Sequence, residues 1–340
     1  MSAVPELVVY GTGSVGGYLG GRLHGLTAVR FIVRERMLRT LRERGMTLTD
    51  LHGFQRVIDG PALDLRTGAA DAIAPLVLVT VKSGDTPQAA RELADVLPAD
   101  ALVISFQNGL HNAELLCAAL PGRTVLAGMV PFNVLQREPG AFHQGSSGEL
   151  MVEDHPALQR YLPLFAAAGL PIEPRRDMAA VQRAKLLFNL NNAINALSGL
   201  PLRDELARRS WRRCLALAQG EALAIFARLG LPVAKLTPLP PRWLPLLLKL
   251  PDALFARVAS RMLAIDPLAR SSTWEDLQAG RRTEVGALHG AVVELAGRAG
   301  QRAPVNQRII ELVREAEARP VVWTSERLLE ELSSAANKPA

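Results

Sequence analysis

Three glycines near the amino terminus have the spacing of a loop that binds nucleotide phosphates. Gly11, Gly13 and Gly16 follow the apolar run 7–10 and precede a segment, 18–24, that can form a helix. A glycine permits the tight first turn, the second lets a pyrophosphate approach the backbone, and the third lets helix and strand pack closely, while the helix N-terminus supplies N–H donors. We therefore predict a dinucleotide site, with a glycine-rich structural turn as the alternative. Its loop residues are Gly11, Thr12, Gly13, Ser14, Val15 and Gly16.

The residue after the second apolar strand favours one dinucleotide over another. That strand, 31–33, is followed by Arg34, where sites for NAD usually carry an acidic residue that binds the ribose hydroxyls. An arginine can instead pair with a 2′-phosphate, so NADPH is the expected cofactor. Two alternatives stay open: Glu35 is the ribose-binding acid if the strand ends one residue later, or Arg34 is only a surface residue.

Two polar residues follow apolar strands of the kind that a parallel sheet buries on both faces. Lys82 comes at the end of the run 75–81, and Asn108 comes shortly after the run 101–106. Ligands of open α/β sheets bind outside the carboxyl ends of the strands. Both side chains are therefore expected to face the crevice that the glycine loop borders. A helix cap or a turn residue is the alternative for each.

One segment of the carboxyl-terminal half carries an unusual set of amides. We expect a single helix over 178–195, in which asparagine, a poor residue for a helix interior, occurs at four positions. At about 100° per residue, Asn189 and Asn192 lie within roughly 40° of Lys185, so one face carries an amine and two amides. Because buried amides need partners, this face binds substrate or makes a polar contact with another helix. The amides on other sides of the helix are Asn191 and Asn195.

A second polar segment, 269–284, is by itself typical of two helix starts. Ser271 or Ser272 can cap a helix that begins beside them. Thr283 can cap the next helix, and Glu284 then lies in its first turn, where the helix dipole favours an acid. From these residues alone, both roles are structural.

The order of apolar runs and helix-like segments predicts two domains of different class. Residues 1–177 alternate strands and helices and include short β-segments between 125 and 152, which is typical of an α/β Rossmann-type dinucleotide-binding domain. From residue 179 apolar residues recur at helical spacing, so residues 178–335 are expected to form an all-α domain that binds substrate. Helices are expected over 37–45, 87–97, 112–120, 201–229 and within 238–265.

Composition is that of a soluble globular protein. Of the 340 residues, 49% are hydrophobic and 21% are charged, with a net charge of +6. The arginines are scattered among acids, so we expect a small anionic ligand and no nucleic acid. Cys117 and Cys214 have no disulfide or metal spacing, the chain starts without an apolar leader, and prolines and charges interrupt the apolar segment 243–255. We therefore expect a cytoplasmic protein with no metal and no membrane anchor.

Taken together, the motifs resemble the ketopantoate reductase family, the NADPH-dependent 2-dehydropantoate 2-reductases of pantothenate and coenzyme A biosynthesis. The resemblance runs over 8–312, and the motifs that carry it lie at 11–16, 79–82, 107–109, 185–189 and 271–284. It implies a two-domain fold like that of 6-phosphogluconate dehydrogenase and hydride transfer from NADPH to the 2-oxo carbon of a small 2-oxo acid. It leaves open a homodimer.

The resemblance also implies roles for individual residues. Lys185 corresponds to the proton donor to the substrate ketone, and Glu284 corresponds to a second catalytic or substrate-orienting group. The substrate-binding positions are Asn108, Asn189, Asn192 and Ser272. Those near the nicotinamide end of the cofactor are Lys82 and Asn108.

Three positions depart from the family pattern. Ala193, Arg203 and Ala269 stand where the family has asparagines, with Asn192 beside the first as a substitute, and the stretch 236–269 is longer than in compact members. These departures bear on the substrate and leave the cofactor prediction unchanged. A reductase of another 2-oxo or 3-oxo acid and a non-catalytic NADPH-binding sensor or scaffold are therefore the alternatives.

Overall fold

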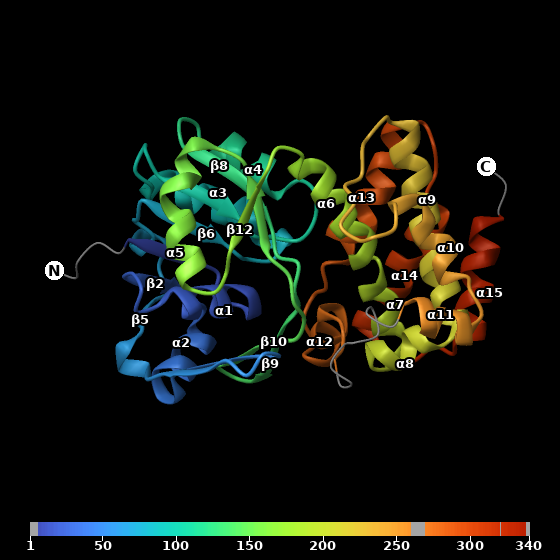
Figure 1. The fold of residues 1–340 in the computed structure, drawn as a ribbon, viewed down its shortest axis with the longest axis horizontal. Helices are drawn as coiled ribbons and strands as arrows, with labels where there is room; N and C mark the ends of the chain where they lie inside the picture. Colours follow the sequence, from blue (N-terminus) through green and yellow to red (C-terminus); the bar gives the residue numbers. More distant parts are fainter. Residues whose placement is uncertain (1–5, 260–268, 320, 338–340) are drawn as a thin grey trace. The chain divides into compact units, whose positions relative to one another are not determined.

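The computed structural model describes residues 6–259, 269–319 and 321–337, and the chain divides into two compact units, Met1–Met178 and Ala179–Ala340. The first unit combines strands with helices, and the described part of the second is built from helices (Figure 1). The expected fold class, an α/β domain followed by an all-α domain, is confirmed.

An eight-stranded sheet forms the centre of the first unit, in the order β12-β11-β8-β7-β6-β1-β2-β5. Neighbours from β5 to β8 pair in parallel, whereas β8 and β11 are antiparallel. The parallel strands are continuous apolar runs because both of their faces are covered. The strands are β1 (Leu7–Tyr10), β2 (Val29–Ile32), β5 (Asp64–Arg66), β6 (Leu76–Val79), β7 (Leu102–Ser105), β8 (Thr124–Met129), β11 (Leu150–Glu153) and β12 (Ile172–Arg175).

Successive side chains of β1 enter two different cores. Leu7 and Val9 lie in the core to which α1, α2 and α5 contribute, whereas Val8 and Tyr10 lie in the core formed with α3 and α4. Helices therefore cover both faces of the sheet, as in a doubly wound α/β domain. The helices are α1 (Ser14–Leu23), α2 (Glu35–Arg44), α3 (Thr86–Val96), α4 (Asn112–Ala119) and α5 (Leu162–Ala167).

A second sheet of four strands has the order β4-β3-β10-β9. Its strands are β3 (Met46–Asp50), β4 (Gln55–Ile58), β9 (Val134–Glu138) and β10 (Ala141–Gln144). The sequence predicted short strands in both regions, but it gave no sign that β3 and β10 pair in parallel. Leu48 and Phe142 of this sheet lie in the same core as Leu19 of α1.

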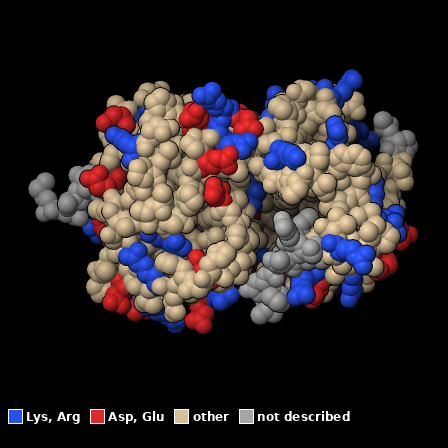
Figure 2. All heavy atoms as spheres, viewed as in Figure 1, with Lys and Arg blue, Asp and Glu red and all other residues tan. Residues whose placement is uncertain are grey.

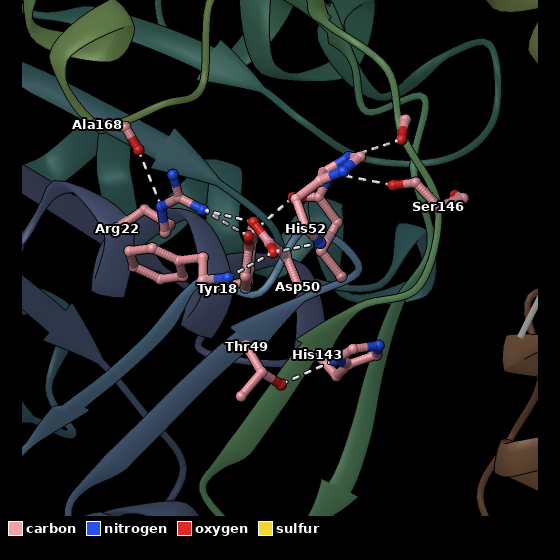
Figure 3. A network of polar contacts seen from close by, with 11 residues as sticks. Tyr18, Arg22, Thr49, Asp50, His52, His143, Ser146 and Ala168 are labelled. Atoms are coloured by element: carbon pink, nitrogen blue, oxygen red, sulfur yellow. Dashed lines mark hydrogen bonds and ion pairs between the residues drawn. The ribbon is translucent and has the colours of Figure 1, made fainter.

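Arg22 of α1 joins the second sheet to the rest of the unit (Figure 3). Its Nε donates to the Ala168 carbonyl at 2.9 Å, its Nη1 donates to the Tyr18 hydroxyl at 2.9 Å, and its guanidinium pairs with Asp50 at 3.5 Å. The guanidinium also lies 3.8 Å from the centre of the Phe54 ring. Because α1 begins at the glycine loop, this network fixes the helix behind that loop.

On the face drawn in Figure 2, basic and acidic side chains are interspersed over the α/β unit, in keeping with the scattered charges of the sequence. Within the described ranges, no helix combines the length and the apolar character needed to cross a membrane. Part of the helical stretch expected within 238–265, residues 260–265, lies outside the described residues.

The second unit is helical in its described part. Its helices are α6 (Met178–Asn189), α7 (Asn191–Ser198), α8 (Leu202–Ala207), α9 (Arg209–Arg228), α10 (Leu244–Leu248), α11 (Asp252–Val258), α12 (Ser272–Gln278), α13 (Val285–Arg298), α14 (Pro304–Ala318) and α15 (Ser325–Ala336). The prediction of one continuous helix over 178–195 is therefore wrong, because α6 ends before Leu190 and α7 begins after it.

A side chain from another helix explains the interruption. Gln219 of α9 donates from Nε2 to the Leu187 carbonyl at 3.0 Å. That carbonyl is the acceptor that a continuous helix would use for the Asn191 N–H. A side chain inserted into the hydrogen-bond ladder breaks a helix at that point, and the low helix propensity of the neighbouring asparagines lowers the cost.

Candidate active site

The glycine loop lies at the point where the strand order of the sheet reverses. It follows β1, which pairs with β2 on one side and with β6 on the other. Gly11 has a φ of 100°, in the left-handed region, and a Cβ at Gly16 would lie 2.3 Å from the Gly11 carbonyl oxygen. A tight turn and a close helix–strand contact therefore require these glycines, as expected from the sequence.

Gly13 differs from both because its surroundings are open. A Cβ at Gly13 would meet no protein atom within 4 Å, and Gly13 occupies the N-cap position of α1 without a side chain that caps the helix. Free space beside an uncapped helix N-terminus fits the pyrophosphate of a dinucleotide. Thr12 is buried and donates from Oγ1 to the Ile32 carbonyl at 3.2 Å, which attaches the loop to β2. Ser14 and Val15 begin α1 and are partly exposed.

The end of β2 places Arg34 directly before α2. The strand ends at Ile32, Arg34 is the N-cap residue, and Glu35 is the first residue of the helix. The Arg34 side chain is 82% exposed and pairs with Asp85, with Nη2 and Oδ2 2.6 Å apart. Arg34 therefore presents a guanidinium at the surface, and its competitor as a ribose ligand, Glu35, lies inside the first helical turn.

Lys82 and Asn108 lie beyond the carboxyl ends of neighbouring strands. Lys82 precedes the 3-10 turn Ser83–Asp85 after β6, and Asn108 follows β7. Ser83 donates from Oγ to the Asn108 carbonyl at 2.8 Å, and Asn112 donates from Nδ2 to Ser83 Oγ at 3.1 Å. These bonds join the two loops at the edge of the sheet where the glycine loop also lies.

Gln107 fixes the course of the chain into Asn108, a role that the sequence did not assign to it. It is buried, and its Nε2 donates to the Val81 carbonyl at 3.0 Å and to Thr86 Oγ1 at 2.7 Å. Ser105 Oγ donates to its Oε1 at 2.9 Å. A polar residue directly after a buried strand is the sequence signal for such a role.

Lys185 and Asn189 lie one turn apart on α6, which places them on one face of that helix. Lys185 is partly buried, and burial lowers the pKa of its ammonium to about 8. Asn189 is buried. Asn192 was expected on the same helix face, but it belongs to α7, beyond the interruption at Leu190.

The side-chain amides of Asn191 and Asn195 contact other segments of the second unit. Asn191 and Asn195 both donate from Nδ2 to Glu205 Oε2, at 3.3 and 2.8 Å. Asn195 Oδ1 also accepts the backbone N–H of Ser271 at 2.9 Å. These two amides, on the other sides of the predicted helix, therefore have partners within the protein. Substrate binding remains a prediction for Asn189 and Asn192.

Ser271 and Ser272 have different surroundings. Ser271 is buried and caps α12, with its Oγ accepting the Trp274 N–H at 3.2 Å and donating to the Asn192 carbonyl at 2.8 Å. Ser272, the first residue of α12, is exposed. The cap prediction is therefore confirmed for Ser271, and Ser272 is left accessible to a ligand.

The position predicted for Glu284 at the next helix is wrong by one residue. Glu284 itself occupies the N-cap position of α13, not its first turn. Thr283 stands before it, where its N–H and Oγ1 both donate to Glu317 Oε1, at 2.8 and 2.7 Å. Thr283 Oγ1 also accepts the Val285 N–H at 3.4 Å, so the hydroxyl that donates to α14 still pairs with a backbone donor at the start of α13. Glu284 is partly exposed.

The three departures from the family pattern lie in different surroundings. Ala193 and Ala269 are buried, each 2% exposed, whereas Arg203 is exposed on α8. The Ala269 carbonyl accepts the Leu202 N–H at 2.9 Å, so the segment before Ser271 is held by its backbone. Ala193 and Ala269, where the resemblance implies asparagines, are thus buried methyl groups.

An α/β unit with a glycine loop at its topological switch point, followed by a helical unit, defines a class of two-domain nicotinamide-dependent oxidoreductases. Comparison with known proteins identifies the family. The protein-family model described as "Ketopantoate reductase PanE/ApbA" matches residues 7–157 of the sequence. A second family model, described as "Ketopantoate reductase PanE/ApbA C terminal", matches residues 177–317. The chain belongs to the ketopantoate reductase family.

Individual relatives agree with this assignment. The chain is 32% identical to a 2-dehydropantoate 2-reductase of Halobacterium salinarum, over 92% of this chain and 99% of the relative. A PanE/ApbA family ketopantoate reductase from Ralstonia eutropha superposes with a TM-score of 0.77 at 28% identity, covering 92% of this chain and 99% of the other. D-mandelate dehydrogenase, solved with NADH and anilino(oxo)acetate, shares the fold at a TM-score of 0.76 and 15% identity, covering 92% of this chain and 98% of the other.

Proposed function

We propose that this protein reduces 2-dehydropantoate to pantoate with NADPH, with the α/β unit binding the cofactor and the helical unit binding the substrate. Lys185 on α6 carries the proposal, because burial lowers its pKa and the resemblance to the family implies that it is the proton donor. In this role the protein serves pantothenate and coenzyme A biosynthesis in the cytoplasm.

Reduction of the 2-oxo group requires the protein to orient the ketone, stabilise negative charge on its oxygen and deliver a proton. NADPH supplies the hydride when bound. An ammonium at Lys185 polarises the carbonyl and then donates its proton to the oxygen. Asn189 and Ser272 anchor the substrate, with Asn108 and Asn192 as further ligands, and Glu284 orients Lys185 or accepts a hydrogen bond from a substrate hydroxyl.

The cofactor proposal rests on the first unit alone. The open space at Gly13 and the uncapped start of α1 suit a pyrophosphate, and Arg34 suits a 2′-phosphate. Lys82 and Asn108 are proposed to lie near the nicotinamide, because they follow strands at the same edge of the sheet.

A panel of 2-oxo and 3-oxo acids that includes ketopantoate tests the proposal, with NADPH oxidation followed by absorbance. We expect ketopantoate to have the highest kcat/KM. Faster turnover of another acid would instead favour the second candidate, a reductase of a different oxo acid. The buried methyl groups of Ala193 and Ala269 favour that candidate, because they replace polar family residues. Tight NADPH binding without turnover of any acid would indicate a sensor or scaffold.

A further inference from the structure

A buried carboxyl group in the second unit makes no contact that the proposed chemistry uses. Glu205 of α8 is 0% exposed, and its Oε2 accepts hydrogen bonds from Asn195 and Asn191. Its Oε1 has no hydrogen-bond partner among the described residues. Burial raises the pKa of Glu205 to about 8, so the group is mostly protonated at neutral pH.

Asn195 contacts both Glu205 and Ser271 and so connects α8 with the start of α12. Its Nδ2 donates to Glu205 Oε2 at 2.8 Å and to the Leu200 carbonyl at 3.0 Å. Its Oδ1 accepts the Ser271 N–H at 2.9 Å. Since all of its hydrogen-bonding groups have partners, the amide has one orientation, and that orientation depends on Glu205 as acceptor.

The end of this chain of contacts is the start of α12. Ser271 is held through its N–H by Asn195 and through its Oγ by the Asn192 carbonyl, and the exposed Ser272 follows directly. The contacts thus connect α8, α7 and α12 through side chains that are nearly or fully buried. A small displacement at one end is transmitted because such polar networks have few alternative arrangements.

We propose that Glu205 is a positioning residue that sets the place of Ser272 and of the Asn192 backbone through Asn195 and Ser271. This rests on the proposed function, in which Ser272 and Asn192 bind the substrate. Glu205 touches neither substrate nor cofactor in this role. It determines how well the substrate is held and leaves the proton donor on α6 in place.

Two substitutions of Glu205 distinguish the effect of its side-chain acceptor oxygen from the effect of its side-chain volume. Glu205→Gln keeps an oxygen that accepts from both asparagines. Glu205→Leu fills similar space and leaves both amides without this acceptor. For the leucine variant we expect KM for the oxo acid to rise about tenfold, the effect of losing one such hydrogen bond, with kcat within about threefold of the parent. Glu205→Gln is expected to restore KM.

Leu328→Ala is the matched control, a truncation of a buried leucine on α15 outside this network. It is expected to lower Tm without raising KM. If Glu205→Leu fails to fold, Asn195→Ala breaks the same chain of contacts and carries the test. An equal KM in the Leu and Gln variants, or an equal rise in KM in the control, would overturn the proposal.

Hydrogen–deuterium exchange provides a readout that does not depend on turnover. Peptides covering 269–280 are expected to exchange faster in Glu205→Leu than in the parent or in Leu328→Ala, because the Ser271 N–H loses its fixed acceptor. If the parent reduces no oxo acid, the proposed function fails while this exchange still decides the role of Glu205. Unchanged exchange over this segment would refute that role.

Discussion

Arg34 and Asp85 form an ion pair across the first unit, with Nη2 and Oδ2 2.6 Å apart, although 51 residues separate them in the sequence. Arg34 occupies the N-cap position of α2, whereas Asp85 lies in the turn after β6. An exposed pair of this kind contributes only about 0–1 kcal/mol. A bound phosphate can therefore replace Asp85 as the partner of the guanidinium, because a phosphate accepts two charge-assisted hydrogen bonds from arginine.

The first prediction concerns cofactor choice. Asp85→Asn removes the competing carboxylate, so we expect NADPH to bind about two- to fivefold more tightly and NADH to bind as before. Arg34→Ala should weaken NADPH binding about tenfold or more and leave NADH unaffected. Titration of intrinsic fluorescence with each dinucleotide measures both. Equal effects on the two cofactors would show that Arg34 does not contact a 2′-phosphate.

The second prediction assigns the proton donor. Lys185→Ala is expected to abolish turnover while NADPH still binds, because Lys185 lies in the second unit and the proposed cofactor site lies in the first. Loss of a general acid costs about 100- to 10,000-fold in rate. Steady-state kinetics and cofactor titration of the same preparation measure both effects. Undiminished turnover would remove Lys185 from the mechanism.

The third prediction follows from the pKa of Lys185, which burial lowers to about 8. The ammonium is the active form, so kcat/KM for the oxo acid should be constant below this pH and fall about tenfold per pH unit above it. The measurement is a pH profile of kcat/KM at saturating cofactor. A profile that stays flat to about pH 10, near the ordinary pKa of lysine, would contradict a lowered value.

The fourth prediction compares two glycines of the phosphate loop. Gly16→Ala should lower the free energy of unfolding by about 1–3 kcal/mol or more, because its methyl group would lie 2.3 Å from the Gly11 carbonyl oxygen. Gly13→Ala meets no protein atom and should change stability by less than about 1 kcal/mol, yet weaken NADPH binding by occupying the open space. Denaturant unfolding and cofactor titration distinguish them. Wild-type affinity in Gly13→Ala would argue against a phosphate at this position.

The fifth prediction concerns stability and pH at Glu205, whose pKa burial raises from 4.5 to about 8. Between these values the folded protein keeps a proton that the unfolded chain has lost. The contribution of Glu205 to the free energy of unfolding is therefore full below pH 4.5 and falls by about 1.4 kcal/mol per pH unit until the folded group ionises. The neighbouring thiol, Cys214 of α9, has a pKa raised to about 12 and stays neutral throughout.

Glu205→Gln lacks this titration and provides the comparison. The free energy of unfolding of the variant minus that of the parent should therefore increase as the pH is raised from about 5 to about 8. Urea unfolding of both proteins at several pH values measures the difference. Parallel pH dependences would show that Glu205 ionises normally in the folded state.

Features that depend on neighbouring residues were predictable from the sequence. The apolar run before Gly11, the glycine spacing and the four-residue separation of Lys185 and Asn189 each define a local conformation, and the structure has β1, the loop and a shared face of α6 at these places. The change from alternating strands to helical spacing near residue 179 gave the two fold classes. The resemblance to the family added predicted roles, among them those of Lys185 and Glu284.

Only the tertiary structure decided which buried polar groups meet. The contact of Asn195 with Ser271 spans 76 residues, and the contact that ends α6, from Gln219 to the Leu187 carbonyl, spans 32. The parallel pairing of β3 with β10 also joins segments that are far apart in the sequence. Local periodicity fixes which face of an element is apolar. The partner of an amide or carboxyl group is fixed only when distant segments pack and each buried donor must find an acceptor.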